Sequence, residues 1–373
     1  MLTYLGMFAI SLTFLKIGYS VTNLSSKKNK LVFKYLFIIM SIMLPCIMAS
    51  QRNIMIGSDT KGYIYKLFKL AKETNGLTEF FDDAYNWYHI RDYLYLSLTY
   101  SIAHLFGSFK VFLFAIEVLI IVPIFFALNN NKKCNNEVIF GMFIFFMFMY
   151  NMTYCLARQS IAISFLILGL SNLQNNKKVS AIVCLLVSIG FHITSLLSII
   201  IYVIFILCKM LNKSDKKTKI ILLSLLYIIS FIILIFFKKI VYFLGGHGIY
   251  KHGILFLQTF TQFDFSYMDT ALYLFMLYIF IKGKNNESNY DFFMVMGSES
   301  VIVLQLGAFI KFMERVSYYS FYPFLVLTIP KAVINNNKIN KKRMFLVSFV
   351  SIAYWILAFK VLNLFDTVPY ILM

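Results

Sequence analysis

The chain has 373 residues, of which 60% are hydrophobic, 18% are aromatic and only 14% are charged. Because soluble domains hold about 45–50% apolar and about 25% charged residues, this composition excludes a soluble fold. The formal net charge of +19 would suit a nucleic-acid partner, but the lysines cluster in short loops between apolar segments. Short basic loops stay on the cytoplasmic side of a membrane, so the charge indicates topology and no nucleic acid is expected.

Apolar segments recur along the whole chain and predict an all-α, polytopic integral membrane protein with one transmembrane domain over residues 1–373. About twelve spans are expected, at residues 3–21, 33–50, 109–128, 138–154, 158–174, 179–191, 193–210, 220–237, 268–281, 292–310, 316–334 and 344–362. With the basic loops inside, both ends of the chain lie outside. Residues 51–92 and 238–267 then form the larger extracytoplasmic loops.

Residues 93–106 are apolar but short, and they carry Ser97, Thr99, Ser101 and His104. Counted as a full span, this segment would move every later basic loop to the outside. We therefore expect a re-entrant helix here, which must be buried in protein or line a cavity.

The stretch from Lys177 to Lys209 is expected to form a helical hairpin. As a single helix it would be ~50 Å long, against a hydrocarbon core of ~30 Å. Two short helices that turn near Gly190 fit better, and this turn places His192 at the outer face.

The motif "GSDTKGYIY" at residues 57–65 follows the second expected span directly. Gly57 suits a tight turn, and Ser58 or Asp59 can cap a helix that begins at Thr60. Asp59 is either only this cap or a carboxylate at the membrane surface that acts as general base or binds a sugar hydroxyl. Tyr63 would lie one turn further along the same helix.

Arg158 and Gln159 begin an apolar segment. An arginine at a helix N-terminus opposes the macrodipole, which favours anions there. Arg158 is either an interfacial arginine whose charge reaches water, or part of an anion site that combines a guanidinium with a helix N-terminus. His192, at the hairpin turn, is either a structural residue or a donor and proton carrier.

Arg315 begins another apolar segment at the same face, next to Glu314. Glu314 can pair with it, yet a second arginine in this position repeats the pattern of Arg158, and two guanidiniums can hold one diphosphate. Glu299, inside the preceding span, is an intramembrane acid and therefore a functional candidate.

No metal ion or other cofactor is expected. The five cysteines are scattered without a CxxC pair, and His247 and His252 stand five residues apart with no third ligand nearby.

Four of these motifs together resemble the EpsG-type, Wzy-like polysaccharide polymerases. They are "GSDTKGYIY", "RQSIAISFLILGLSNLQNNKK" from residue 158, "GFHITSLL" from residue 190 and "ERVSYYSFYPF" from residue 314. Their order and spacing match, and the resemblance runs over most of the chain. Its most specific part is the Arg-Gln helix followed about thirty residues later by the Phe-His motif.

The resemblance implies a metal-independent glycosyltransferase of the bacterial cytoplasmic membrane, with its active face extracytoplasmic. Such enzymes join oligosaccharide repeat units carried on undecaprenyl diphosphate into capsule, exopolysaccharide or O-antigen, and a flippase and a chain-length regulator are candidate partners. On this chain Arg158, Gln159 and Arg315 would bind the diphosphate. Asp59 or His192 would deprotonate or orient the acceptor hydroxyl, and the remaining candidates to line the substrate site are Tyr63, Glu299 and Tyr318.

Two other functions remain open. A lipid-linked oligosaccharide flippase or other transporter would also be polytopic, but it should show an internal repeat and broken spans. A membrane O-acyltransferase that modifies the glycan could use His192, but it would leave the paired arginines unexplained.

Overall fold

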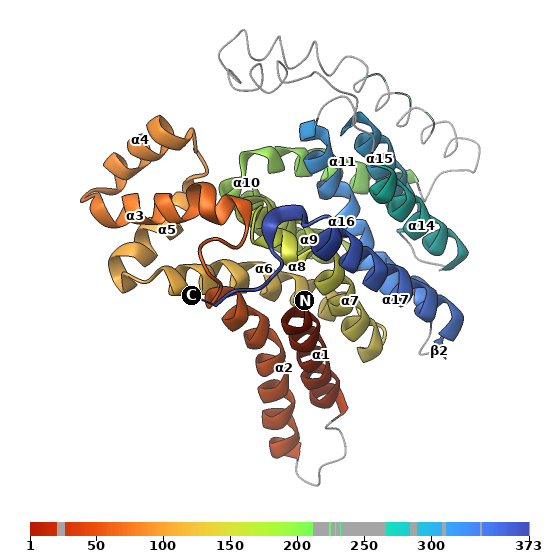
Figure 1. The fold of residues 1–373 in the computed structure, drawn as a ribbon. Coiled ribbons are helices and arrows are strands. Elements are labelled where there is room, and N and C mark those ends of the chain that lie inside the picture. The colour runs from red at the N-terminus through yellow and green to blue at the C-terminus, as the bar shows by residue number, and fades with distance from the viewer. Residues whose placement is uncertain are drawn as a thin grey trace. The chain divides into compact units, whose positions relative to one another are not determined.

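The computed structural model describes residues 1–20, 27–211, 266–283, 289–307, 311–335 and 338–372, with three isolated positions between 212 and 265. The chain is helical and divides into two compact units (Figure 1). Unit 1 comprises Met1–Leu196 and Val333–Met373, and unit 2 comprises Leu197–Ala332. The expected span at 220–237 and most of the expected loop at 238–267 lie outside the described residues.

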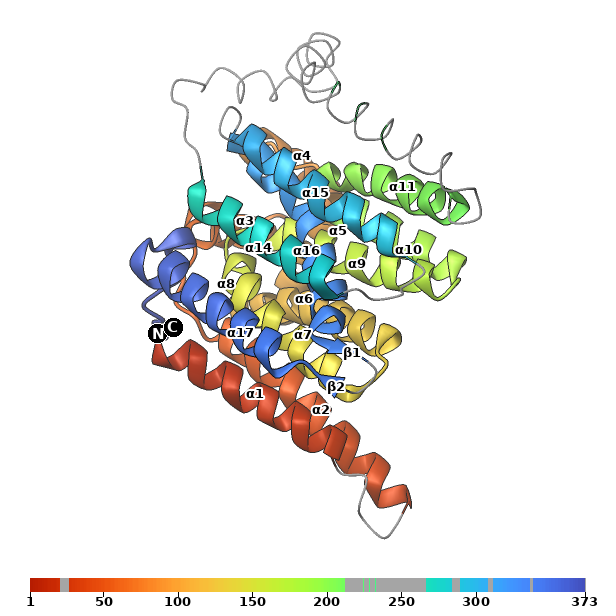
Figure 2. The same ribbon diagram turned by 90° about the vertical axis from the view of Figure 1, so that its right-hand side faces the viewer.

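Unit 1 begins with two long helices that pack side by side, α1 (Leu2–Ser20) and α2 (Lys27–Ser50) (Figure 2). The hydroxyl of Ser11 donates to the carbonyl of Ser41 at 2.7 Å and so satisfies a polar side chain inside this apolar contact. Helix α6 (Phe109–Asn131) packs against α2.

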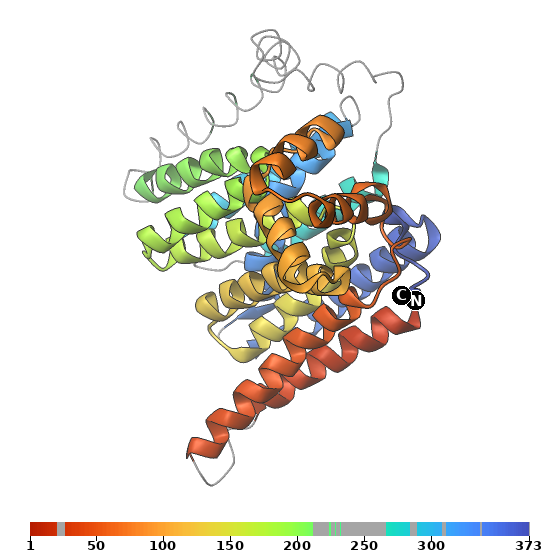
Figure 3. The ribbon, with the colours of Figure 1, turned by 90° about the vertical axis from the view of Figure 1, so that its left-hand side faces the viewer.

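Short helices occupy the expected outer loop at 51–92 and the segment after it. They are η2 (Thr60–Ile64), α3 (Tyr65–Glu73), α4 (Leu77–Tyr88) and α5 (Tyr93–Phe106), drawn in orange in Figure 3. The bounds of α5 match the segment singled out from the sequence. Gly57 makes the expected turn with φ of +88°, and η2 begins at Thr60 as expected. The capping role of Asp59 was wrong, because its side chain makes no cap hydrogen bond.

The core of unit 1 is formed by α7 (Asn135–Phe148), α8 (Tyr150–Thr153), α9 (Ala157–Gln174) and α10 (Lys178–Phe191). Small polar residues let these helices approach closely: Ser164 and Ser171 of α9 donate to carbonyls of α6 at 3.1 and 3.0 Å. The predicted span at 138–154 is not one helix, since it breaks at Met149. After α10 the chain turns at His192 into η3 (Ile193–Leu196), at the end of this part of unit 1. The pairing of α10 with the helix that follows the turn stays a prediction.

The C-terminal part of unit 1 returns to the start of the chain. A two-stranded hairpin, β1 (Ile334–Asn335) and β2 (Lys338–Ile339), leads into α17 (Lys341–Trp355), η4 (Ile356–Val361) and η5 (Leu364–Asp366). Tyr4 donates to the carbonyl of Thr367 at 2.7 Å, and Asn53 donates through its backbone to Ile371 at 2.8 Å. Both ends of the chain therefore lie side by side (Figures 2 and 3).

Unit 2 contains α11 (Leu197–Leu211), α14 (Tyr267–Gly283), α15 (Tyr290–Gly307) and α16 (Lys311–Val333). Helices α14 and α15 pack together and α15 also contacts α11. The ring of Tyr273 stacks on that of Phe321, and its hydroxyl lies 3.2 Å from the hydroxyl of Ser317, which joins α14 to α16.

Within the described residues, five helices are long and apolar enough to cross a membrane: Leu2–Ser20, Asn29–Ser50, Phe109–Asn131, Ile193–Leu211 and Lys341–Val361. The all-α, membrane-embedded class expected from the sequence is confirmed. The count of twelve spans and the re-entrant character of α5 stay predictions.

Candidate functional site

The candidate site of unit 1 is organised by a buried carboxylate, that of Asp92, in the short connection between α4 and α5. Only 3% of this side chain is exposed, and three donors surround it. Its Oδ2 atom lies 2.5 Å from Nη1 of Arg158 and 3.1 Å from Nδ1 of His192, while Oδ1 accepts from the backbone N–H of Ile193 at 3.0 Å. One oxygen therefore joins the two ionisable residues that sequence analysis had selected separately.

Arg158 reaches Asp92 from the second residue of α9. Its Nε donates to the hydroxyl of Tyr63 at 3.2 Å, and its guanidinium lies 5.1 Å from the ring centre of Tyr63 and 6.0 Å from that of Tyr95. Aromatic faces attract a guanidinium, so these contacts hold the side chain in one orientation. The Arg158 side chain is 20% exposed. Its Nη2 atom takes no part in the hydrogen bonds to Tyr63 and Asp92.

His192 ends α10 in an extended backbone conformation, and 18% of its side chain is exposed. The contact of Nδ1 with a carboxylate favours the tautomer with its proton on Nδ1, which leaves a lone pair on Nε2. The arrangement therefore prepares Nε2 to accept a proton from a ligand.

The electrostatics of the site keep Asp92 ionised. Burial alone would raise the pKa of its carboxyl, but the hydrogen bond and charge of His192, the charge of Arg158 and the Ile193 N–H together lower it below 3.8. Burial raises the pKa of the Tyr63 hydroxyl above 10.0 against the opposing charge of Arg158, so this hydroxyl stays protonated. Tyr63 thus accepts from Arg158 and retains a proton to donate.

Asp59 and Gln159 lie beside this cluster in the chain. Asp59 is half-buried immediately before η2, and its charge acts on the hydroxyls of Tyr63 and Tyr95. Gln159 follows Arg158 on α9 and is 5% exposed. Their roles in substrate binding stay predictions.

The other expected site residues belong to unit 2. Tyr318 is buried in α16 and donates its hydroxyl to Oε1 of Glu314 at 2.8 Å. Arg315 is exposed on the same helix, and Glu299 is half-buried in α15. Their grouping with Arg158 stays a prediction.

Sequence analysis missed a second buried polar group in unit 1. The side chain of Arg52, at the end of α2, is fully buried over the ring of Tyr154 at 4.0 Å and donates Nη1 to the carbonyl of Ala49 at 2.9 Å. Fully buried Glu117 of α6 accepts from Thr153 at 2.7 Å. Nε and Nη2 of Arg52 and Oε2 of Glu117 have no hydrogen-bond partner among the described residues. Glu117 had a sequence signal that went unused, since it is an acid inside an apolar span.

Within the described part of the chain, no group of three or more histidine, cysteine, aspartate or glutamate side chains is placed to hold a metal ion. The site consists of an ion pair, a carboxylate-bound imidazole and a tyrosine hydroxyl.

A largely helical chain that has, within its described residues, five helices long and apolar enough to cross a membrane is an integral membrane protein. The chain belongs to the EpsG family, whose model matches residues 7–372, and EpsG is a family of Wzy-like polymerases. Comparison with curated proteins and with solved structures gave no match.

Proposed function

We propose that this protein is a membrane glycosyltransferase that joins oligosaccharide repeat units carried on undecaprenyl diphosphate into a surface polysaccharide. The reaction takes place at the outer face of the bacterial cytoplasmic membrane. Family membership supports the polymerase class. The observation that carries the site assignment is the single Asp92 oxygen that contacts both Arg158 and His192.

In the proposed reaction an acceptor hydroxyl of one repeat unit attacks the anomeric carbon of the growing chain. The new C–O bond forms as the bond between that carbon and the lipid diphosphate breaks, and the lipid diphosphate leaves with the bonding electron pair. His192 takes the hydroxyl proton on Nε2. Asp92 orients the imidazole and stabilises the imidazolium that forms. This is the role of the carboxylate beside a catalytic histidine in other enzymes.

Arg158 is proposed to bind the departing diphosphate through Nη2, with Gln159 beside it. Because the leaving group gains charge as the bond breaks, a guanidinium fixed in place by Tyr63 and Asp92 stabilises the transition state more than the ground state. Tyr63 can donate to the same group. Asp59, at the base of η2, remains the proposed partner of a sugar hydroxyl, and Arg315, Glu299 and Tyr318 remain proposed substrate contacts in unit 2.

The experiment is a gel of the surface glycan from cells that carry the wild type, no protein, Arg158→Ala or His192→Ala at matched expression. We expect single repeat units in place of long chains for the deletion and both variants. Arg91→Ala and His104→Ala are matched controls, since both residues are exposed and neither contacts Asp92. Their glycans should keep the wild-type length.

Each alternative function gives a different pattern in the same experiment. If deletion leaves lipid-linked units inside the cell, the protein is a transporter and the polymerase proposal fails. If chain length is unchanged and an acyl substituent disappears, the protein is an O-acyltransferase.

A further inference from the structure

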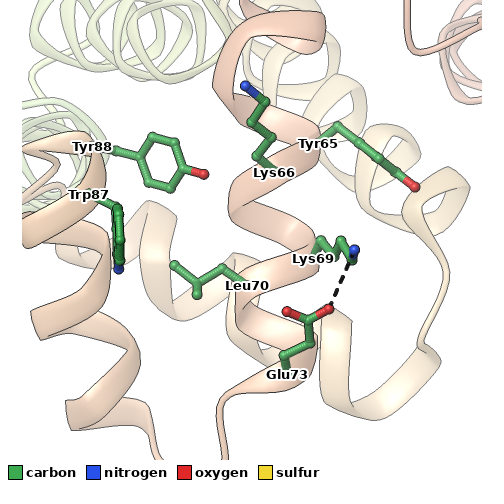
Figure 4. Close-up of a pocket in the computed structure, with 7 residues that line it drawn as sticks. All are labelled: Tyr65, Lys66, Lys69, Leu70, Glu73, Trp87 and Tyr88. Atoms are coloured by element: carbon green, nitrogen blue, oxygen red, sulfur yellow. Dashed lines mark ion pairs between the residues drawn. The ribbon is translucent and has the colours of Figure 1, made fainter.

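A second candidate binding site lies between α3 and α4, apart from the Asp92 cluster. It is a pocket of about 280 Å³ lined by Tyr65, Lys66, Lys69, Leu70, Glu73, Trp87 and Tyr88. Figure 4 shows Trp87 and Tyr88 on α4 facing Leu70 and Lys66 on α3, with Glu73 one turn beyond Lys69. No role was predicted from sequence for these side chains, although Tyr65 closes the motif at residues 57–65.

The exposed tryptophan is the unusual feature of this pocket. Trp87 is 73% exposed, whereas the other tryptophan of the chain, Trp355, is fully buried and donates Nε1 to Asn151 at 2.9 Å. An exposed indole at the edge of a pocket offers an aromatic face on which a ligand can stack.

The polar groups around Trp87 define the class of ligand. Three of the seven lining side chains are charged, and the only aliphatic one is Leu70. Lys69 and Glu73 form an ion pair at 3.7 Å, while Lys66 forms none within the described chain. Aromatic faces beside hydrogen-bonding side chains match a sugar ring, which has an apolar C–H face and a rim of hydroxyls. Tryptophan and tyrosine beside lysines also occur as membrane-interface anchors, and the lipid-quenching measurement below separates that role from sugar binding.

The pocket adjoins the Asp92 cluster along the chain. Tyr65 follows Tyr63 by two residues, and Trp87 precedes Asp92 by five, which limits the Cα separation of the latter pair to about 18 Å. The two helices that form the pocket are therefore directly connected to the segments that carry Tyr63 and Asp92.

We infer that this pocket is a saccharide subsite, in which a sugar ring of the glycan stacks on Trp87 and Tyr88 and hydrogen-bonds to Lys66 and Glu73. The assignment of its ligand to the polymer rests on the proposed function. The subsite holds the glycan near the cluster between successive additions, so it sets how many units are added before the chain dissociates.

The test uses the two tryptophans of the full-length protein in lipid nanodiscs. Iodide quenches the fluorescence of exposed Trp87 but not of buried Trp355, so protection from iodide reports directly on the pocket. The probe is a size-fractionated set of oligosaccharides released by mild acid from the host's own surface polysaccharide, with dextran of matched size as the control. We expect the oligosaccharides to protect Trp87 in the wild type and in Arg158→Ala, and dextran to protect it at least tenfold less well.

A parallel gel reads the product of Trp87→Ala, with Phe106→Ala as the control for loss of an exposed aromatic side chain at 63% exposure. We expect shorter chains for Trp87→Ala and normal chains for Phe106→Ala. If the wild type polymerises but the oligosaccharides do not protect Trp87, the subsite is refuted and the polymerase stands. If Trp87 is protected but deletion of the protein leaves polymer length unchanged, the subsite stands and the polymerase fails. Quenching of Trp87 by brominated lipid, without protection by glycan, would identify it as a membrane anchor and refute the subsite.

Discussion

The ion pair between Asp92 and Arg158 can be tested by its coupling energy. Arg158→Met keeps an unbranched aliphatic stem and removes the charged guanidinium, and Asp92→Asn keeps the shape of the carboxylate. An asparagine still offers an oxygen to the backbone N–H of Ile193, which the carboxylate accepts at 3.0 Å. The double variant removes both charges together.

The exposures of the two side chains set the expected magnitudes. Removing one partner of a buried ion pair costs about 3–5 kcal/mol because the other charge stays buried. Asp92 is 3% exposed and Arg158 is 20% exposed, so an unpaired Asp92 is worse solvated than an unpaired Arg158. We expect a loss of about 3 kcal/mol for Arg158→Met and about 2 kcal/mol for Asp92→Asn. The double variant should lose about 3 kcal/mol, which corresponds to a coupling of about 2 kcal/mol.

The assay is the free energy of unfolding from denaturant titration in detergent micelles, for the wild type, both single variants and the double variant. Arg91→Met serves as control and should change stability by less than about 0.5 kcal/mol, because Arg91 is exposed. If the two single losses add to within about 0.5 kcal/mol, the pair is not coupled. The assignment of Asp92 as the centre of the site would then be wrong.

Three further predictions concern stability. Gly57→Ala should lower the free energy of unfolding by about 1–3 kcal/mol, because φ is +88° and the new Cβ would lie 2.7 Å from a backbone carbonyl oxygen. The measurement is thermal unfolding. Gly62→Ala is the control, since nothing lies within 4 Å of its Cβ. Arg52→Met should cost about 1–3 kcal/mol, because it removes the hydrogen bond to the Ala49 carbonyl and the contact with the Tyr154 ring; a loss below about 0.5 kcal/mol would contradict this reasoning. Since the pKa of Asp92 is lowered below 3.8, its stabilisation is present above that pH and is lost as pH falls through the lowered value. The stability difference between wild type and Asp92→Asn should therefore shrink as the pH falls below about 4, and a difference that stays unchanged or grows in that range would exclude this sign.

Helices with clear start and stop residues were predictable from sequence. The helix at 93–106 was expected with its observed bounds, because polar Asp92 precedes it and Gly107 ends it in the left-handed region at φ of +60°. The turn at His192 was expected from length, since one helix from Lys177 to Lys209 would exceed the membrane thickness.

Breaks inside apolar stretches were not predictable. The span expected at 138–154 breaks at Met149, where no glycine or proline marks the change, so only packing against other helices decides it. The bounds of helices α3 and α4 were not predicted, for a different reason. They are amphipathic and only 9 and 12 residues long, too short to cross a membrane, so residues 51–92 beyond the helix expected from Thr60 were taken as an outer loop.

The site could be predicted where a residue was costly in its local setting. Arg158 and His192 stand out because ionisable groups border apolar segments there. Asp92 gives no such signal, since an acid in a polar connection costs nothing until the fold buries it. Its burial depends on contacts 66 and 100 residues away in the chain, which no local pattern contains.

The pairing also accounts for the unfavourable position of Arg158. A cation in the first turn of α9 is opposed by the helix macrodipole, whereas Asp92, immediately before α5, is favoured by the macrodipole of that helix. The unfavourable interaction of Arg158 with the dipole of α9 is therefore offset by its contact with Asp92 and by the favourable interaction of Asp92 with the dipole of α5. The same geometry favours His192 over Asp59 as the proposed base, because His192 has the oriented nitrogen and the adjacent carboxylate that proton transfer requires. Asp59, half-buried immediately before η2, stays the proposed partner of a sugar hydroxyl.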